Sequence, residues 1–421
     1  MGLGTFVGFG LSTFVVLLSI VYALLSDLPV NSANGISSVY HDSMLANLTD
    51  AAKGKTIVVT GSSQGLGLIF AENAAKLGAK KIVMLNRSSP RSDEAVMRVL
   101  DARSDETAEV IHIPMDLSSF ESVHAAAYTV RKKVDKINVL ACNAGVMALN
   151  EEVTEDGFDI QAQTNHLSHF LLVQLLFPLL ETTSLKGESV RIIQHSSQAR
   201  HMPLANGPLE ARYFHTVQEP GELGGNGTTL LFGGPNWKRY QQTKLANLNF
   251  GFALAQRLAI YQIKMVSCVA APGTSFTALQ ANAFAFGGVH NAINSFIARY
   301  AGHSNEDASL PITVCAFDPN VKNGDFYEPS EGAKGTPVLI KASEEKEAND
   351  KVQQRKLWEW SEEAIGAQLI SDRKMPIVRK TEYTSTRKAT EAEWAKGRHP
   401  TPEETDKQGG RKEEKKEGKR S

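Results

Sequence analysis

Hydrophobic and polar positions alternate with two different periods between residues 53 and 270. Short apolar or β-branched runs predict buried strands over Thr56–Thr60, Lys81–Leu85, Val110–Pro114, Val139–Cys142, Val190–His195 and Met265–Ala270. Amphipathic segments between them predict helices over Leu66–Leu77, Ser119–Lys132, Phe158–Leu180 and Tyr240–Ala259. Strands that alternate with helices are typical of a parallel sheet covered on both faces. We therefore predict an α/β fold with a doubly wound parallel sheet.

The first thirty residues follow neither period. From Thr5 to Leu25 the chain has 21 residues without a charge, which is enough helix to cross a bilayer core of about 30 Å. No Lys or Arg precedes Lys53, so the basic segment that opens a cleaved signal peptide is missing. We expect a retained transmembrane helix within residues 1–30, followed by a polar spacer over 31–52. A cleaved signal is the alternative.

Two further segments interrupt the alternation of strands and helices. Residues 200–239 are rich in Gly and Pro, which predicts a long loop, and loops of that length are often lids or binding loops. From residue 372 to 421 the chain is polar and strongly charged, which predicts a disordered tail. The catalytic domain is therefore expected over 53–371, with the insert 200–239 near the mouth of the substrate site.

Composition excludes some classes of function. Of the 421 residues, 42% are hydrophobic and 22% are charged, as in an ordinary globular enzyme. A net charge of −1 argues against a nucleic-acid surface over the whole protein. The three cysteines lie far apart and show no Cys/His spacing, so we expect neither a disulfide framework nor a metal site.

A glycine-rich turn, Thr60–Gly67, lies between the first predicted strand and the first helix. Gly61 suits the tight bend, Gly65 lets the backbone approach a pyrophosphate, and Gly67 allows close packing of helix on strand. The helix N-terminus then offers amides to the phosphates. The alternative is a plain strand-to-helix turn. We predict a dinucleotide site that also involves Ser63, Gln64 and Leu66.

The end of the second strand bears on which dinucleotide binds. An NAD site places an acidic residue there for the ribose hydroxyls, whereas this chain has Asn86 and Arg87. A guanidinium can form paired hydrogen bonds with a 2′-phosphate. Arg87 therefore favours NADP(H), the alternative being a surface arginine without a ligand.

Tyr240 and Lys244 are four residues apart on a predicted helix, so they share one face. An unperturbed phenol has a pKa of about 10. A neighbouring ammonium stabilises the phenolate and is expected to lower that pKa, which gives a usable general acid–base. A dinucleotide site combined with an activated tyrosine indicates hydride transfer to or from a carbonyl carbon.

These motifs, together with Asn143-Ala144-Gly145 after the fourth strand, resemble the short-chain dehydrogenase/reductase superfamily. The resemblance runs from about Lys53 to Gln368 and implies a Rossmann fold. Further segments resemble the branch that contains retinol dehydrogenases, WW-domain oxidoreductases and light-dependent protochlorophyllide reductases, namely Thr164–Leu172, Lys244–Asn247 and Leu357–Glu363.

The resemblance implies a catalytic tetrad. Tyr240 would move the proton at the substrate oxygen, and Lys244 would lower the tyrosine pKa and hold the nicotinamide ribose. Of two adjacent serines after the fifth strand, Ser197 occupies the family's position and would polarise the carbonyl. Asn165 would hold the water that links Lys244 to solvent.

The resemblance also implies cofactor contacts outside the glycine turn. Asp116 and Leu117 would contact the adenine, and Asn143, Ala144 and Gly145 would lie beside the adenosine ribose. Pro272 and Gly273 would form the turn that closes over the nicotinamide, with Thr274 and Thr277 as candidate contacts to the carboxamide or the phosphates. Two positions depart from the branch, because Cys142 stands where asparagine is common and Ala271 replaces the usual histidine.

The chain is thus expected to be a membrane-anchored, NADP(H)-dependent oxidoreductase acting on a lipophilic small molecule such as a retinoid, sterol or long-chain aldehyde. The expected location is the endoplasmic reticulum membrane with the domain facing the cytosol, since all Lys and Arg follow the anchor. A carbon–carbon double-bond reductase and a non-catalytic NADP-binding scaffold are alternatives, and a homodimer stays open.

Overall fold

The computed structural model describes residues 37–201, 207–229, 232–275, 302–346 and 348–370. The predicted anchor within residues 1–30 and the predicted tail over 372–421 lie outside the described residues. The chain divides into two compact units, residues 1–365 and 366–421. Everything below concerns the first unit, because only residues 366–370 of the second are described.

The centre of the first unit is an eight-stranded sheet in the order β3-β2-β1-β4-β5-β6-β7-β8. All neighbouring pairs are parallel except β7 and β8, which run antiparallel. The strands are β1 Thr56–Thr60, β2 Lys81–Asn86, β3 Glu109–Pro114, β4 Val139–Cys142, β5 Arg191–His195, β6 Val266–Ala270, β7 Phe326–Pro329 and β8 Pro337–Ile340. The order of the strands reverses between β1 and β4, and the crevice at such a switch point is where ligands bind in these sheets.

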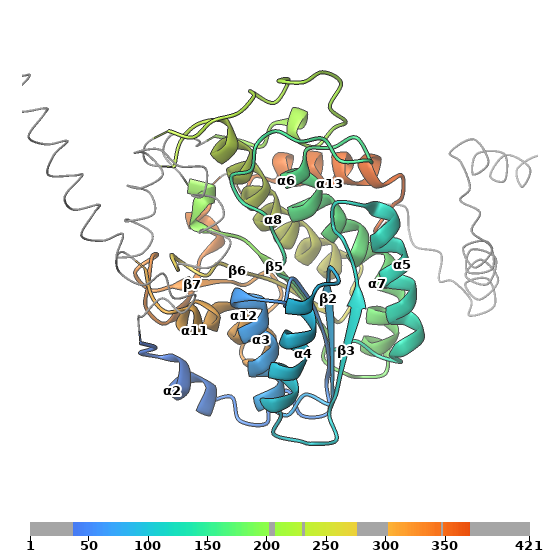
Figure 1. The fold of residues 1–421 in the computed structure, drawn as a ribbon, viewed down its shortest axis with the longest axis vertical. Helices are drawn as coiled ribbons and strands as arrows, with labels where there is room; N and C mark the ends of the chain where they lie inside the picture. Colours follow the sequence, from blue (N-terminus) through green and yellow to red (C-terminus); the bar gives the residue numbers. More distant parts are fainter. Residues whose placement is uncertain (1–36, 202–206, 230–231, 276–301, 347, 371–421) are drawn as a thin grey trace, which may run out of the picture. The chain divides into compact units, whose positions relative to one another are not determined.

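Helices cover both faces of the sheet (Figure 1). One face carries α3 Gly65–Lys76, α4 Pro90–Asp101, α11 Asn305–Ala308 and α12 Leu310–Phe317. The other carries α5 Phe120–Lys133, α7 Ser168–Leu185 and α8 Pro235–Ile260, with α13 Lys351–Ile365 packed on α8. Phe70 of α3 and Phe317 of α12 stack with ring centroids 5.9 Å apart in the buried core. The predicted doubly wound α/β fold is confirmed.

Several elements differ from the sequence prediction. Helix α4 was not predicted, although its start carries ordinary signals: Ser89 Oγ accepts a hydrogen bond from the Ser92 amide, and Pro90 occupies the first turn. The short strands β7 and β8 were not predicted either. Helix α8 begins at Pro235 rather than at Tyr240, because a proline is tolerated in the first helical turn. The predicted loop 200–239 is therefore shorter, and it contains a 3₁₀ turn at Ala211–Tyr213.

The predicted spacer over 31–52 is folded where it is described. It contains α2 His41–Ala46, and Leu48 and Ala52 are buried in the core. His41 Nε2 lies 2.9 Å from Asn73 Oδ1 of α3. The segment looks polar in sequence because it is short and only a few of its residues reach the core, so the spacer prediction was wrong for these residues.

The helix predicted over Phe158–Leu180 consists of three parts: α6 Ile160–Ala162, a π-helical segment η1 Gln163–Leu167, and α7. Together they span Ile160–Leu185, which is long and apolar enough to cross a membrane by length and composition alone. Its most apolar stretch is 67% buried inside the fold, however, as is usual for the core helix of a globular domain. The π-helical segment contains Asn165, and such segments often occur at functional sites.

Candidate active site

Tyr240, Lys244 and Ser197 meet at the carboxyl ends of the central strands. Tyr240 and Lys244 lie one turn apart on α8, and Ser197 follows β5. The side chains of Ser197 and Tyr240 are hydrogen-bonded. Lys244 Nζ donates to the carbonyl of His195 at 3.0 Å and lies 5.7 Å from the Tyr240 ring centroid. The structure thus brings the buried phenol and ammonium together with the half-buried Ser197 hydroxyl.

Burial controls the ionisation of this group. It raises the pKa of Tyr240 above the usual value, and the hydrogen bond with Ser197 offsets part of that increase. It also lowers the pKa of Lys244 to about 8. The expected lowering of the tyrosine pKa by Lys244 is therefore not found, because the ammonium is bound to the His195 carbonyl and desolvation dominates. At neutral pH Tyr240 carries its proton and can donate it.

The two serines after β5 have different partners. Ser196 Oγ donates to the Lys244 carbonyl at 2.7 Å, so its hydroxyl is used to fasten β5 to α8. Ser197 Oγ accepts from the Ala199 amide at 3.2 Å and bonds Tyr240. Only Ser197 therefore shares a polar contact with the phenol.

Asn165 joins the loop after β4 to α8. Its Oδ1 accepts from the Val146 amide at 2.7 Å, and its Nδ2 donates to Thr243 Oγ1 at 2.9 Å. A Cβ added to Gly145 would lie 3.1 Å from Asn165 Oδ1 and 3.5 Å from Lys244 Nζ. Asn165 thus lies close to Lys244 across Gly145. Its role in holding a water stays a prediction.

His169 is a site residue that the sequence interpretation did not assign. Thr60 Oγ1 accepts from the amides of Asn143 at 3.0 Å and Ala144 at 2.9 Å, so its own hydrogen is directed to His169 Nε2 at 2.9 Å. His169 Nδ1 then donates to the Asn165 carbonyl at 3.0 Å. Burial lowers the pKa of His169 to about 4, so the ring is neutral. The available signal is a histidine four residues after Asn165 on one helix.

The glycine turn packs directly on the loop after β4. Gly61 has φ +67°, and a Cβ there would lie 2.7 Å from the Ala144 Cα. A Cβ on Gly67 would lie 2.3 Å from Asn143 Nδ2. Gln64 precedes α3, and its side chain accepts no hydrogen bond from the first amides of the helix, so Gln64 does not cap them. The turn, with Ser63, Gly65 and Leu66, therefore fits the phosphates of a dinucleotide.

Asn86 was also not assigned as a site residue. Its Oδ1 accepts from the Ser62 amide at 2.6 Å, while its Nδ2 is buried and has no hydrogen-bond partner among the described residues. Such a donor fits a ribose hydroxyl or a phosphate oxygen. Arg87 beside it is exposed, and Arg91 Nη1 donates to Gln64 Oε1 at 2.9 Å. The end of β2 thus supplies the donors that an adenosine 2′-phosphate requires.

The remaining predicted contacts lie at the same edge of the sheet. Asp116 Oδ1 accepts from Ser118 Oγ at 2.7 Å, and the Leu117 carbonyl accepts from Ser168 Oγ at 2.6 Å. The turn Pro272–Thr274 follows β6, and the Thr274 amide donates to the Ala333 carbonyl at 2.8 Å. A Cβ on Gly273, whose φ is +72°, would lie 2.6 Å from that carbonyl oxygen.

Fold and site together define a class. Within the described ranges no group of three or more His, Cys, Asp or Glu side chains could hold a metal ion. The available groups are instead a glycine turn at the switch point, a proton donor and an ammonium. The chain is a Rossmann-type protein with a dinucleotide site beside an acid–base group.

Known proteins narrow this class. A family model described as short chain dehydrogenase matches residues 55–209. An uncharacterized oxidoreductase of Schizosaccharomyces pombe is 35% identical over 218 residues, which cover 51% of this chain and 59% of that protein. The short-chain dehydrogenase/reductase prx1 of Penicillium roqueforti is 29% identical over 318 residues, covering 74% of this chain and 85% of that protein.

Solved structures agree on the fold. An uncharacterized protein from Mycobacterium paratuberculosis is 25% identical with a TM-score of 0.54, covering 76% of this chain and 98% of that chain. The L-sorbose reductase of Gluconobacter frateurii is 21% identical with a TM-score of 0.51, covering 68% of this chain and 98% of that chain. The chain is thus similar to short-chain dehydrogenases/reductases, both in the segment 55–209 that the family model matches and in the relatives that carry this name. It spans 47% to 59% of the length of the first curated relatives it matches.

Proposed function

We propose that the protein is a membrane-anchored, NADP(H)-dependent oxidoreductase that interconverts a carbonyl and an alcohol on a lipophilic substrate. The observation that carries the proposal is the hydrogen bond between the half-buried Ser197 and the buried Tyr240, with Lys244 one turn away on α8. Reduction of a carbonyl requires a proton donor and a second hydroxyl that both hydrogen-bond the same carbonyl oxygen.

The chain's own groups perform the acid–base part of the reaction. NADPH, when bound along the glycine turn, supplies the hydride to the carbonyl carbon. Tyr240 donates its proton to the carbonyl oxygen as negative charge develops there, and Ser197 hydrogen-bonds the same oxygen. Lys244 places a positive charge one turn from the phenol, where it stabilises the phenolate left behind. Asn165 holds the loop after β4 against α8.

The cofactor preference can be tested at the end of β2. We expect Arg87→Ala to weaken NADPH binding about tenfold while NADH binding stays nearly unchanged, because only the 2′-phosphate loses its charged partner. Titration of nicotinamide fluorescence with both nucleotides measures this. Equal losses for the two nucleotides would contradict the assignment of Arg87.

Lys244 should make nucleotide affinity depend on pH. Because its pKa is lowered to about 8, the ammonium is present below that pH and is lost as the pH rises through it. We expect the Kd for NADPH to increase between about pH 7 and pH 9, since an attractive charge disappears beside the bound anion. The variant Lys244→Met should give a flat profile over the same range. A flat profile in the wild-type protein would refute the expectation.

An apolar cluster supports the proposal of a lipophilic substrate. Met147, Ala148, Ala199 and Trp237 are buried around Tyr240, with Phe232 packed against them. Trp237 lies edge-on to Tyr240, with ring centroids 5.9 Å apart. The phenol therefore faces aromatic and aliphatic groups on this side, and a predominantly apolar lining is typical of pockets for apolar ligands.

The start of the described chain is linked to the active-site edge. The amides of Val39, Tyr40 and His41 donate to the Asp307 carboxylate at 2.8, 3.0 and 2.9 Å. Asp307 lies on α11, four residues after His303, whose Nε2 bonds the Pro272 carbonyl at 2.8 Å. The start of the described chain is thus tied to the turn proposed to close over the nicotinamide. We further propose that substrate enters from the bilayer, and that this is the endoplasmic reticulum membrane with the domain in the cytosol.

Consumption of NADPH by the full-length protein in membranes tests the function. Retinal, steroid ketones and medium- to long-chain aldehydes are offered one at a time. Turnover of any of them that disappears in Tyr240→Phe supports a carbonyl reductase. Tight NADPH binding without turnover of the panel would overturn the proposed reaction and favour the double-bond reductase or the scaffold.

A further inference from the structure

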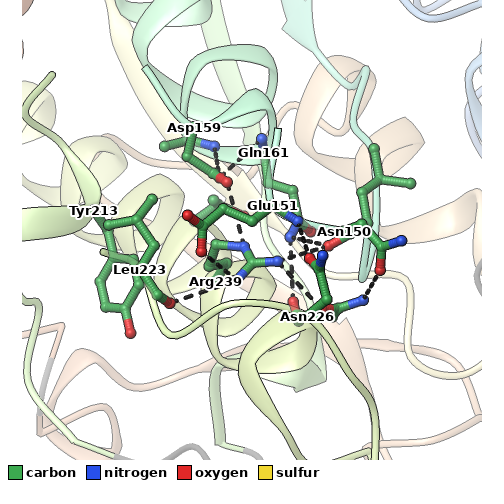
Figure 2. Close-up of polar contacts among 12 residues, drawn as sticks. Asn150, Glu151, Asp159, Gln161, Tyr213, Leu223, Asn226 and Arg239 are labelled. Atoms are coloured by element: carbon green, nitrogen blue, oxygen red, sulfur yellow. Dashed lines mark hydrogen bonds and ion pairs between the residues drawn. The ribbon is translucent and has the colours of Figure 1, made fainter. Parts of the chain in front are cut away.

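The residue just before Tyr240 is an arginine with no exposed side-chain surface. Arg239 donates from Nη1 to the Gly225 carbonyl at 2.7 Å and from Nη2 to the Leu149 carbonyl at 3.0 Å. Two carboxylates approach the same guanidinium, Glu151 at 3.8 Å and Asp159 at 3.3 Å. Figure 2 shows these groups converging on Arg239 from separate parts of the chain. The catalytic helix is therefore bound through one side chain to several distant loops.

Glu151 extends this cluster into the insert. Its two carboxylate oxygens accept from the amides of Gly221 at 2.6 Å and Gly225 at 2.9 Å. Its own amide donates to Asn226 Oδ1 at 2.6 Å (Figure 2). The Arg239–Glu151 pair thus holds both ends of the segment 221–226. The segment is thereby attached to α8 through the Arg239 side chain, and its Leu223 is buried as well.

Asp159 connects the same guanidinium to the helix that contains Asn165. Its Oδ1 caps α6 by accepting from the amides of Gln161 and Ala162, both at 3.0 Å. Burial raises the pKa of Asp159 to about 6, so above that pH the carboxyl is ionised and pairs with Arg239. The cluster therefore fastens the insert, the loop after β4 and the start of the Asn165 helix to the residue adjoining Tyr240.

We propose that Arg239 is a positioning residue for the substrate site and so determines how tightly substrate binds. Through the Leu149 carbonyl it holds the loop whose Met147 and Ala148 pack around Tyr240, and together with Glu151 it joins the segment 221–226 to that loop. The inference rests on the proposed function and deepens it, because it assigns the position of this apolar loop to a polar clamp. Among the described residues no hydrogen bond or ion pair joins Arg239, Glu151 or Asp159 to Ser197, Lys244 or the glycine turn, so we expect cofactor binding to be independent of the clamp.

Three variants test the clamp at about pH 8: Arg239→Met, Glu151→Gln and, as a control, Arg212→Met. Arg212 lies in the same insert but forms a half-exposed pair with Glu210 at 2.9 Å. In Arg239→Met and Glu151→Gln we expect amide hydrogen exchange at Gly221 and Gly225 to accelerate about tenfold or more, because a charge-assisted partner is lost. We also expect KM for the carbonyl substrate to increase about tenfold, with kcat and the Kd for NADPH changed less than about twofold. The control should match the wild type.

The outcomes separate the clamp from general stability. Faster exchange confined to 218–229 together with a raised KM supports the proposal. If amide hydrogen exchange in Arg239→Met is faster throughout the sheet, the result for Glu151→Gln decides between the clamp and a general loss of stability. That variant is milder because it leaves the buried guanidinium in place. Wild-type exchange at Gly221 and Gly225, or a loss of kcat without a change in KM, would overturn it. Absence of turnover in the wild-type protein would instead overturn the proposed function.

Discussion

Replacing Tyr240 with phenylalanine is expected to lower kcat by about 10²- to 10⁴-fold, the usual contribution of a positioned general acid. The ring and its contacts with Trp237 remain, so the fold and the apolar wall are kept. Only the hydroxyl that bonds Ser197 is removed. The Kd for NADPH should stay within about twofold of the wild-type value, because the phosphate-binding turn is formed by other elements. Initial rates and fluorescence titration give the two quantities.

The chain contains a matched control for this substitution. Tyr128 and Lys132 have the same four-residue spacing on α5, and Lys132 Nζ lies 5.4 Å from the Tyr128 ring centroid. Tyr128→Phe should leave kcat unchanged, because no serine hydroxyl or glycine turn accompanies that pair. An equal loss of activity in both variants, or normal activity in Tyr240→Phe, would refute the assigned role of Tyr240.

Replacing Arg200 with methionine should have the largest effect on stability, a loss of about 3–5 kcal/mol in the free energy of unfolding. Arg200 has 1% of its side chain exposed and pairs with Glu345 at 2.6 Å and Glu328 at 2.8 Å. Its Nη1 also donates to the Ser197 carbonyl at 3.0 Å. Removing the cation leaves two largely buried carboxylates without their partner, and it loosens the turn that positions Ser197. Denaturation in urea measures the loss.

An exposed ion pair provides the comparison for Arg200. Arg98 pairs with Glu72 at 2.7 Å, but 58% of its side chain is exposed. Arg98→Met should therefore cost only about 0–1 kcal/mol. A loss of similar size in the two variants would mean that burial does not set the strength of the Arg200 cluster.

Local signals in the sequence were enough for the central part of the fold and for the proton donor. The β-branched runs and the glycine turn predicted β1, α3 and a dinucleotide site at the turn between them. The spacing of Tyr240 and Lys244 alone would not have been enough, because Tyr128 and Lys132 repeat it. The pair Tyr240 and Lys244 follows the strand after which Ser196 and Ser197 lie, whereas Tyr128 and Lys132 precede it, and this order is readable in the sequence.

Features that depend on distant contacts were missed. The folding of α2 depends on Asp307, more than 260 residues away in the chain, and no local pattern announces such a partner. The tyrosine pKa was predicted with the wrong sign, because the spacing of Tyr240 and Lys244 says nothing about burial or about the His195 carbonyl that binds the ammonium. Arg239 likewise looks like an ordinary helical cation in the sequence, because its partners come from the insert, the loop after β4 and the start of α6.

The unpartnered Nδ2 of Asn86 has a thermodynamic consequence. Among the described residues this buried donor has no acceptor, and a desolvated polar group of this kind costs about 1–3 kcal/mol. A nucleotide that accepts its hydrogen bond removes that cost only in the folded state. By mass action, ligand at about 100 times its Kd then stabilises the fold by about 2.7 kcal/mol. The nucleotide that the protein prefers should therefore raise its melting temperature more, and this can be measured before any substrate is known.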